Sequence, residues 1–343
     1  MKRFALGILV GCFGLLGSLA AVYAMLAFLL PASFPAPPLT RLAALDEKLR
    51  FLREHPEIDP RILAVGSSIT WRQLAGNSFD RAAGGRRHFL NGATVSLQIH
   101  QTGDLLDFYL DNYPRVRTVL IMAGLPDFTN CSTEPRAVFD HAAARAYVFQ
   151  RWPAAWFYLR YFSPQRFART AMTLAERQTP LTGDLYLDAY GSGPLQVPDE
   201  SKRGLRYQAM EPDPACVTAL VELSEALNNR GVNLVLVFPP LHPEYRRAYP
   251  GAVSATCRIA RDVEMATRRH KTDLLVLPQD AGFADEDFFD AFHLQYAAAQ
   301  RLSAQVARRI EQSFASAGKA RPAGETQLRH LGRSCAVNEA RSL

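Results

Sequence analysis

The stretch VRTVLIMA at residues 116–123 predicts a fully buried β-strand. Apart from Arg117 and Thr118 it consists of apolar residues, so neither face of the strand is strongly polar. Strands that are apolar on both faces are typical of parallel sheets covered by helices on both sides. The glycine and the proline of the GLPD sequence at residues 124–127 end the strand. This stretch therefore indicates an α/β fold.

Similar apolar stretches occur on both sides of this strand along the chain, and segments with helical spacing separate them. We expect further strands at residues 62–65, 88–90, 232–238 and 274–277, and helices at residues 41–54, 97–113, 214–230, 252–270 and 294–314. Strands that alternate with helices form a parallel sheet with helical crossovers. The sequence therefore predicts a three-layer α/β/α domain at residues 41–316, with a five-stranded parallel sheet.

Residues 130–213 are predicted to be an insertion within this domain and not a separate domain. The first part is aromatic, and the second part is a polar loop that contains glycine and proline. The aromatic residues are Trp152, Trp156, Phe157, Tyr158, Tyr161, Phe162 and Phe167. Three interpretations stay open for them: a sugar-binding platform, a helix at a membrane surface, and a helix packed on the sheet. We favour packing, because aromatic residues are more often buried.

The N-terminus contains 25 uncharged residues, from Leu6 to Leu30, after Lys2 and Arg3. At about 1.5 Å per residue, a helix of this length crosses the hydrocarbon core of a bilayer. Basic residues before such a helix favour a cytoplasmic N-terminus. We therefore predict a single transmembrane anchor and a Pro-rich linker within residues 1–40, with the domain in the periplasm at a bacterial inner membrane.

Two alternatives to the anchor also export the domain. One is a cleaved signal peptide, with a small-x-small cleavage site at Ser18-Leu19-Ala20, and the other is a lipidated Cys12. The apolar run continues well past both positions, so we favour the uncleaved anchor.

The four cysteines beyond the N-terminal segment are compatible with an oxidising compartment. They are Cys131, Cys216, Cys257 and Cys335, and they allow three full pairings. We favour a bond between Cys131 and Cys216, because the first follows a predicted strand end and the second opens a predicted helix. Separate buried thiols are the alternative. No spacing resembles a zinc site, so we predict no metal.

The net charge of +6 lies mainly at the two ends of the chain. Lys2 and Arg3 stand at one end, and residues 317–343 hold five basic and two acidic residues at the other. The remainder holds 32 basic and 31 acidic residues. A nucleic-acid-binding protein concentrates its positive charge on the folded part, so the sequence excludes nucleic acid as a partner. Residues 317–343 lack periodicity and are predicted to form a flexible basic tail.

Polar residues follow three of the predicted strands at their carboxyl ends, where ligands bind in open parallel sheets. The sequence GSSIT at residues 66–70 follows the first strand, and GLPD at residues 124–127 follows the third. The sequence DAFH at residues 290–293 follows the fifth strand and precedes the last helix. A serine at a strand-to-helix turn can act as a nucleophile, with a histidine as its base and an aspartate that holds the imidazole.

We predict Ser68 as the nucleophile, His293 as the general base and Asp290 as the residue that orients the imidazole. Two plainer interpretations stand beside this one. Ser67 and Ser68 are also suitable N-caps for the following helix, and the acidic residues 285–290 also suit a solvated turn or a cation site. The order of the two blocks along the chain favours the catalytic interpretation.

These blocks resemble those of the SGNH/GDSL hydrolase superfamily. Its Gly-Asp-Ser block is similar to Gly66-Ser67-Ser68, with Ser68 in the nucleophile position, and its Asp-x-x-His block matches residues 290–293. The resemblance covers residues 61–314 without the insertion. The Gly-x-Ser-x-Gly elbow of α/β-hydrolases is not matched, because Thr70 replaces the second glycine.

The resemblance implies an oxyanion hole formed by the backbone N–H of Ser68 and by the second and third blocks of the family. Gly92 is the candidate from the second block, with Ser96 as the alternative. The third block of the family supplies an asparagine, but this chain has Asp127 near that place, with Asn130 as an alternative donor. An ionised Asp127 would repel an oxyanion, and the loss of one donor costs about 2.7–4 kcal/mol. We therefore expect Asp127 to be protonated or turned away.

The apolar N-terminus, the Gly-Ser-Ser block and the PPLHP sequence at residues 239–243 resemble one subgroup, the membrane-anchored proteins that O-acetylate or D-alanylate bacterial cell-surface polymers. The resemblance implies an O-acyltransferase that passes an acyl group from Ser68 to a polysaccharide hydroxyl. It also implies a membrane-bound O-acyltransferase as partner and no cofactor. The alternatives are a carbohydrate esterase with the same triad and a non-catalytic scaffold that binds a polymer or a partner through residues 152–167.

Overall fold

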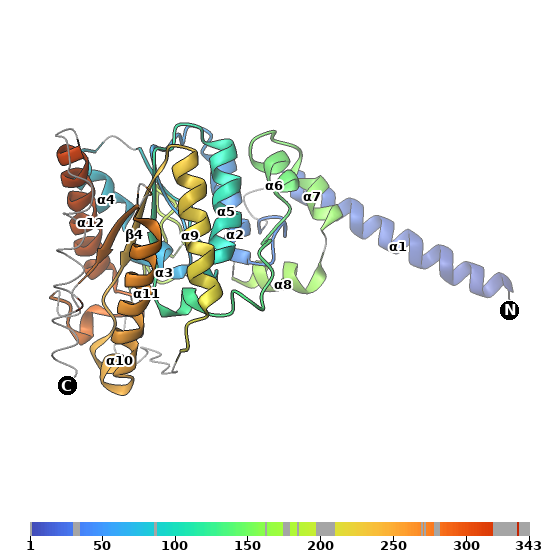
Figure 1. Cartoon of the computed structure of the whole chain (residues 1–343). Helices are drawn as coiled ribbons and strands as arrows, with labels where there is room; N and C mark the ends of the chain where they lie inside the picture. Colours follow the sequence, from blue (N-terminus) through green and yellow to red (C-terminus); the bar gives the residue numbers. More distant parts are fainter. Residues whose placement is uncertain are drawn as a thin grey trace.

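The computed structural model describes residues 2–29, 35–85, 88–161, 163–173, 179–183, 185–196, 210–268, 270, 272–277, 282–317 and 335. Five parallel strands form one sheet in the order β2-β1-β3-β4-β5 (Figure 1). The strands are β1 (Ile62–Ala64), β2 (Phe89–Asn91), β3 (Thr118–Met122), β4 (Asn233–Phe238) and β5 (Thr272–Val276). The predicted five-stranded parallel sheet is therefore confirmed.

Helices precede, connect and follow the strands. They are α1 (Lys2–Leu29), α2 (Ala43–Glu54), α3 (Ser68–Gln73), α4 (Gly76–Ala82), α5 (Ile99–Asn112), α6 (His141–Val148), α7 (Ala154–Arg160), α8 (Pro164–Met172), α9 (Pro214–Asn229), α10 (Pro243–Ala248), α11 (Gly251–Thr267) and α12 (Tyr296–Ala317), with the short 3-10 helices η2 (Leu125–Phe128) and η5 (Asp285–Asp287). The longer helices of the domain match the predicted ones, and the short helices α3, α4, α6, α7, α8 and α10 add to them.

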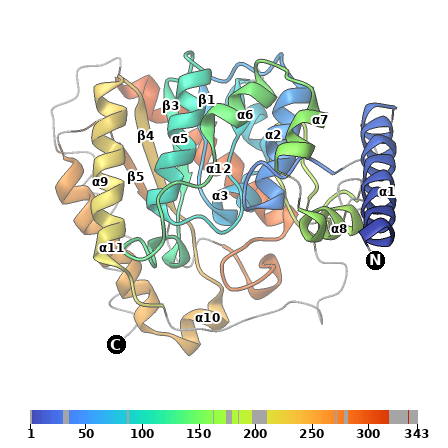
Figure 2. The same ribbon diagram turned by 90° about the vertical axis from the view of Figure 1, so that its right-hand side faces the viewer.

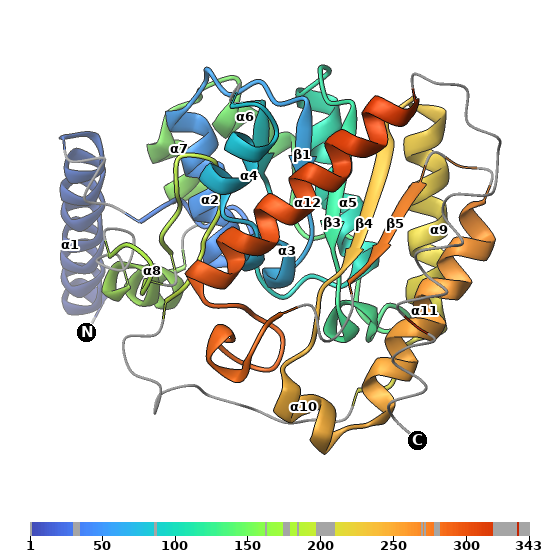
Figure 3. The ribbon, with the colours of Figure 1, turned by 90° about the vertical axis from the view of Figure 1, so that its left-hand side faces the viewer.

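Successive residues of the strands point into two separate hydrophobic cores. In β1, Leu63 belongs to one core and Ala64 to the other, and in β3 the neighbours Val119 and Leu120 alternate in the same way. Helices α5, α9 and α11 cover the first face (Figure 1), and α4 and α12 cover the second (Figure 3). The fold is therefore a three-layer α/β/α arrangement.

Helix α12 illustrates why these segments are helical. Its buried residues Ala298, Leu302, Val306 and Ile310 are four apart, so they form one apolar stripe. This stripe packs on the sheet, and the helix crosses the sheet obliquely in Figure 3. The burial of four aliphatic side chains on one face stabilises a helix whose other face is polar.

The strand order places a topological switch between β1 and β3. The chain leaves β1 toward β2 and then returns to the other side of β1, so the loops after β1 and β3 diverge at the carboxyl end of the sheet. Backbone hydrogen bonding continues beyond the strands, because the N–H of Val65 donates to the carbonyl of Leu120 at 3.0 Å. The loops that carry the predicted site residues therefore meet at one end of the sheet.

Helix α1 extends away from the domain (Figure 1). In the part of the chain that the structure describes, no helix combines the length and the apolar character needed to cross a bilayer. The predicted transmembrane anchor is therefore not supported.

Residues 35–40 of the predicted linker lie against the domain. Ala36 and Leu39 are buried, and the N–H of Ala36 donates to a carboxylate oxygen of Glu47 in α2. The tail predicted at residues 317–343 lies outside the described residues, except for Ala317 and Cys335.

Candidate active site

The first strand ends in a turn that presents Ser68 as the first residue of α3. Ser67 is the N-cap of this helix, and its side-chain oxygen accepts a hydrogen bond from the N–H of Ile69 at 3.1 Å. Ser68 is half-buried, and its hydroxyl takes no part in this cap. The capping interpretation therefore applies to Ser67, and the hydroxyl of Ser68 has another partner.

Thr70 fixes this turn against the sheet. Its Oγ1 accepts from the N–H of Met122 at 3.0 Å and lies 2.8 Å from the Met122 carbonyl oxygen and 3.1 Å from that of Val65. Gly66 has a φ of +141°, and a Cβ at this position would lie 2.4 Å from Thr70 Oγ1. Only glycine therefore fits the turn before the two serines.

Asp290 and His293 are joined within one tight loop. One oxygen of Asp290, Oδ1, accepts the backbone N–H groups of Phe292 at 2.9 Å and His293 at 2.8 Å. The other oxygen lies 2.7 Å from Nδ1 of His293. This carboxylate accepts the Nδ1 proton, which leaves Nε2 of His293 as an acceptor. The predicted contact between the two side chains is present.

Nε2 of His293 lies 2.9 Å from Oγ of Ser68, although the two residues are 225 positions apart in the chain. This distance is within the hydrogen-bond reach that a nucleophile and its general base require. Burial raises the pKa of the Asp290 carboxyl, but the charge of His293 and the donated hydrogen bonds outweigh it, so the pKa is lowered. The structure therefore brings Ser68, His293 and Asp290 into one hydrogen-bonded chain.

Gln73 connects the helix that carries Ser68 with the loop that carries His293. Its side-chain Nε2 donates to the backbone carbonyl of Phe292, the residue before His293. Gln73 is fully buried, and its Oε1 has no partner among the described residues. Sequence reasoning missed this residue, because a glutamine in a short helix carries no signal for a contact about 220 residues away.

Asp127 lies buried beside the turn that holds the serines. Its Oδ2 accepts the N–H of Gly124 at 2.8 Å, and its carboxyl also hydrogen-bonds with the side chain of Ser67. Burial raises the pKa of Asp127 to about 7, while these two bonds and the nearby His293 lower it. Asp127 therefore changes its charge near neutral pH, close to His293.

Gly92 does not fit the oxyanion role predicted for it. Its N–H donates to the carbonyl of Ala64 at 2.8 Å, as a continuation of the β1–β2 pairing, and is not available to a ligand. A Cβ at Gly92 would lie 2.6 Å from the ring of Tyr109, and the hydroxyl of Tyr109 donates to the Gly92 carbonyl at 3.0 Å. This glycine is needed for the packing of Tyr109.

The two alternative oxyanion donors, Ser96 and Asn130, are both exposed and both have a left-handed backbone conformation. Ser96 has a φ of +56°, and its N–H makes no hydrogen bond within the described part of the chain. Asn130 has a φ of +58° and is exposed, and its carbonyl accepts the N–H groups of Thr133 and Glu134. The backbone of Asn130 forms a surface turn, and the N–H of Ser96 has no partner among the described residues.

The acidic loop before the triad is paired with arginines. Asp287 lies 2.7 Å from the guanidinium of Arg301, and Asp285 lies 3.3 Å from that of Arg247. Among the described residues, no group of His, Cys, Asp and Glu is arranged to hold a metal ion. Asp285 and Asp287 are therefore held in ion pairs with arginines.

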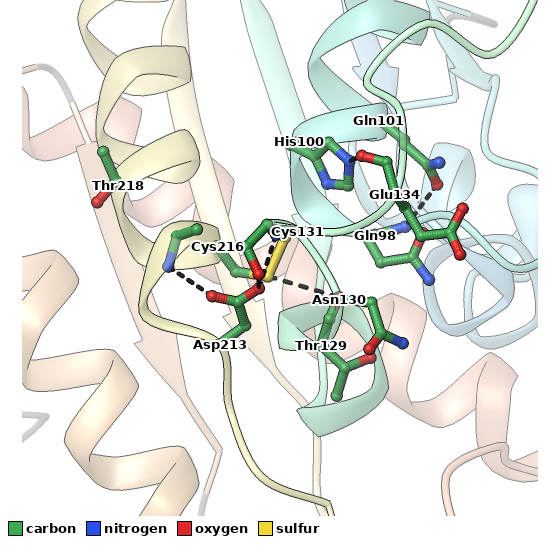
Figure 4. Close-up of a disulfide and its surroundings, with 12 residues drawn as sticks. Gln98, His100, Gln101, Thr129, Asn130, Cys131, Glu134, Asp213, Cys216 and Thr218 are labelled. Atoms are coloured by element: carbon green, nitrogen blue, oxygen red, sulfur yellow. Dashed lines mark hydrogen bonds between the residues drawn. A yellow bond between two sulfur atoms is a disulfide. The ribbon is translucent and has the colours of Figure 1, made fainter.

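A disulfide joins Cys131 and Cys216, as predicted, and a second joins Cys257 and Cys335. Figure 4 shows the first one between the loop after η2 and the start of α9. Asp213 reinforces the same junction, because its Oδ2 accepts the N–H and the hydroxyl of Ser132, each at 2.7 Å. The loop after η2 is therefore fixed covalently to α9.

A cavity of about 640 Å³ lies at the opposite end of the sheet. Its lining includes the first residues of four strands, Ile62, Phe89, Thr118 and Asn233. None of the predicted site residues lines it, so it is separate from the candidate active site at the carboxyl ends.

The aromatic residues of the insertion are divided between core and surface. Phe157 and Tyr158 are buried, so the packing interpretation holds for them, whereas Trp152 and Trp156 are each 49% exposed. Phe162 lies outside the described residues.

No model of a protein family matches the chain, and no curated protein sequence matches it. The geometry of Ser68, His293 and Asp290 is therefore the observation that bears on the function.

Proposed function

We propose that the protein transfers an acyl group through an ester on Ser68. The observation that carries the proposal is the hydrogen-bonded chain from Ser68 Oγ to His293 Nε2 at 2.9 Å and from His293 Nδ1 to Asp290 Oδ2 at 2.7 Å. A nucleophile, a base and an orienting carboxylate in this order are the parts that serine acyl transfer requires. The similarity of these two sequence blocks to the SGNH/GDSL hydrolases supports the same reaction class.

The first half of the reaction forms the acyl-enzyme. Oγ of Ser68 attacks the carbonyl carbon of the acyl donor, while Nε2 of His293 accepts the hydroxyl proton. Asp290 stabilises the imidazolium that forms. When the tetrahedral intermediate collapses, the proton passes to the leaving group, and the acyl group stays on Ser68 as an ester.

The second half releases the acyl group to an acceptor hydroxyl. His293 removes the proton of that hydroxyl, the acceptor oxygen attacks the ester carbonyl, and the proton then returns to Oγ of Ser68. The products are an acylated acceptor and the free enzyme. Since each half uses the same base, one histidine supports both steps.

Backbone N–H groups bind the oxyanion of the tetrahedral intermediate in the proposed reaction. Ser68 is the first residue of α3, and the N–H groups of a first helical turn have no acceptor within the helix. We assign the second donor to the N–H of Ser96 in place of Gly92. Asp127 is compatible with the developing negative charge while its carboxyl is protonated, which its pKa of about 7 allows up to neutral pH.

We propose a hydroxyl of a bacterial exopolysaccharide as the acceptor, with an acetyl group as the acyl group. The resemblance to the proteins that acylate cell-surface polymers supports this choice, as does the near balance of charge within the domain. The same resemblance suggests a membrane-bound O-acyltransferase that delivers the acyl group. Carbohydrate ester hydrolysis is the second candidate, and one observation favours it: the His293 side chain is 17% exposed, so water can reach the base.

We propose that the domain lies in the periplasm, at the inner membrane. Two disulfides favour an oxidising compartment. Exposed apolar side chains along α1 favour contact with lipid, among them Leu9, Phe13 and Leu16. Recovery of the protein in the membrane fraction, with the domain accessible to protease in spheroplasts, is the expected result; a protease-resistant domain in intact spheroplasts would contradict it.

The decisive experiment is an acyl-transfer assay with the full chain. The protein is mixed with an acetyl ester that releases a chromophore, with and without an acetyl-free oligosaccharide. We expect chromophore release and a mass increase of the oligosaccharide by one acetyl group, together with an acetylated peptide that contains Ser68. Release without acetylated sugar would favour the esterase.

The Ser68→Ala variant separates an enzyme from a scaffold. We expect it to lose chromophore release by roughly a thousandfold or more, because the nucleophile is gone. Ser78→Ala, a variant of a half-buried serine in α4, serves as the matched control and should act like the unchanged protein. Equal rates for Ser68→Ala and the unchanged protein would remove Ser68 from the mechanism.

A further inference from the structure

The insertion exposes large apolar side chains on the side of the domain next to α1. Trp152 and Trp156 are each 49% exposed, Leu159 is 60% exposed and Met172 is 78% exposed. Trp156 and Leu159 are three residues apart in α7 and therefore share one face of that helix. Helix α8, which ends with Met172, has no buried residue. The exposure is thus a property of the whole segment and not of one side chain.

Residues 141–175, which contain α7 and α8, are basic and include no acidic residue, although Asp140 directly precedes them. Between residues 141 and 175 the sequence holds five arginines and neither aspartate nor glutamate. Arg160 lies four residues after Trp156 on α7, and Arg169 lies three residues before Met172 on α8. Each arginine therefore shares a helix face with an exposed apolar residue.

This surface is continuous with α1. Helix α7 contacts α1, and Figures 2 and 3 show α7 and α8 on the side of the domain that faces α1. Apolar side chains along α1 are exposed as well, among them Leu15, Val22 and Met25. Exposed apolar side chains that cluster along neighbouring helices and are accompanied by basic residues are typical of surfaces that contact membranes or other proteins.

We propose that this α7–α8 surface, formed by Trp152, Trp156, Leu159, Met172, Arg160 and Arg169, binds the surface of an anionic phospholipid bilayer. Tryptophan is favoured at the boundary between headgroups and acyl chains, because its ring is apolar and its N–H remains hydrated. Arginines at that depth interact with lipid phosphates. This inference extends the proposed location at a membrane and does not depend on acyl transfer.

A polysaccharide is the competing ligand for exposed tryptophans. The charge of residues 141–175 favours lipid. One of their five arginines, Arg166, pairs with Asp46 at 2.8 Å, and an uncharged sugar gains nothing from the other four. The apolar side chains of Leu159 and Met172 offer a sugar no hydrogen bond. The test therefore includes an oligosaccharide as a separate arm.

Tryptophan fluorescence provides the test, because the chain has three tryptophans and the third, Trp71, is only 1% exposed. The full chain is added to vesicles of phosphatidylcholine and phosphatidylglycerol whose acyl chains carry bromine near the headgroup. We expect quenching and a blue shift of the emission, and neither effect in Trp152→Phe/Trp156→Phe, which retains only Trp71. Flotation of the vesicles reports attachment through α1 separately.

Variants of the arginines test the electrostatic part. Arg160→Gln/Arg169→Gln should bind the anionic vesicles roughly thirtyfold more weakly, since each arginine near the surface contributes about fivefold. Arg308→Gln/Arg309→Gln on α12, a pair of exposed arginines elsewhere, should bind as the unchanged protein does.

Three results would overturn the inference. The first is vesicle flotation without tryptophan quenching, which would show attachment through α1 alone. The second is an emission change with oligosaccharide and none with vesicles, which would assign the surface to sugar. The third is an equal loss of binding in both arginine pairs. None of these results affects the ester assay, so the proposed acyl transfer is tested independently of membrane binding.

Discussion

A single side chain, Asp127, makes both the stability and the activity of the protein depend on pH. Burial raises its pKa to about 7, so the folded state holds this proton more tightly than the unfolded state does. The resulting stabilisation is complete at pH below about 4 and is lost as the pH rises through about 7, with a magnitude on the order of 4 kcal/mol.

We expect Asp127→Asn to remove this dependence. The amide remains neutral, and its oxygen can still accept the N–H of Gly124. The unchanged protein should lose kcat/KM above pH 7, as the ionised carboxyl repels the oxyanion, whereas the variant should keep it. Profiles of kcat/KM against pH check this. If both proteins lost kcat/KM equally above pH 7, the charge of Asp127 would have no effect on the reacting atoms.

Asp290→Asn should reduce kcat by roughly 10³–10⁴-fold. The amide can donate to Nδ1 of His293, and Nε2 would then carry the proton and could not accept the Ser68 hydroxyl proton. The far-ultraviolet circular dichroism spectrum should stay unchanged, because the substitution preserves the side-chain shape. An unchanged kcat would show that Asp290 does not set the tautomer of His293.

The spacing of three residues was sufficient to predict the contact between Asp290 and His293, because residues three apart lie within one turn. The contact between His293 and Ser68 could be predicted only from two further features, the order of the two blocks along the chain and the predicted parallel sheet. Gly92 was assigned incorrectly, since its motif does not reveal that its N–H pairs with Ala64. The pKa of Asp127 depends on burial by residues distant in the chain, which no local pattern encodes.

The disulfide between Cys131 and Cys216 links two elements of the fold, because it joins the loop after η2 to α9. It closes a loop with a sequence separation of 85. We expect Cys131→Ser/Cys216→Ser to lower the free energy of unfolding by about 2–5 kcal/mol, measured by urea denaturation. A reductant should lower the stability of the unchanged protein by more than that of the variant. Equal stability of the two proteins without reductant would contradict this expectation.

Gln73 joins α3 to the loop that carries the general base. Gln73→Met preserves most of the volume but leaves the Phe292 carbonyl without its donor, which costs about 1–3 kcal/mol. We expect kcat to fall at least tenfold with KM little changed, because the His293 loop is no longer fixed relative to Ser68.

Thr267→Val is the control for Gln73→Met. It removes a buried hydroxyl on α11, on the other face of the sheet, and should lower stability without changing kcat. If both variants lost only stability, Gln73 would have no positioning role.

Long elements with a clear apolar period were predictable, and short ones were not. All five strands and the helices α2, α5, α9, α11 and α12 appear near their predicted positions. The six-residue helix α3 is too short to show a period, and its conformation depends on the cap at Ser67 and on Thr70. The strand order also depends on tertiary packing, which the alternation of strands and helices leaves open.

The distribution of thiols is a property of the whole molecule. The chain has five cysteines, of which four form disulfides and Cys12 is free. Protein isolated from its own cells and denatured should therefore react with one equivalent of maleimide before reduction and with five equivalents after it. Five reactive thiols before reduction would contradict both disulfides and the proposed periplasmic location.

The two disulfides also divide the molecule into covalent rings. The ring closed by Cys131 and Cys216 contains α6, α7 and α8, and the ring closed by Cys257 and Cys335 contains β5, Asp290, His293 and α12. Between them lies the stretch from α9 to the start of α11. A single peptide-bond cleavage inside either ring cannot separate the pieces, so a nicked chain keeps its general base tethered to the sheet. Such a protein would migrate as one chain on a gel without reductant and as two fragments once the sulfurs are reduced.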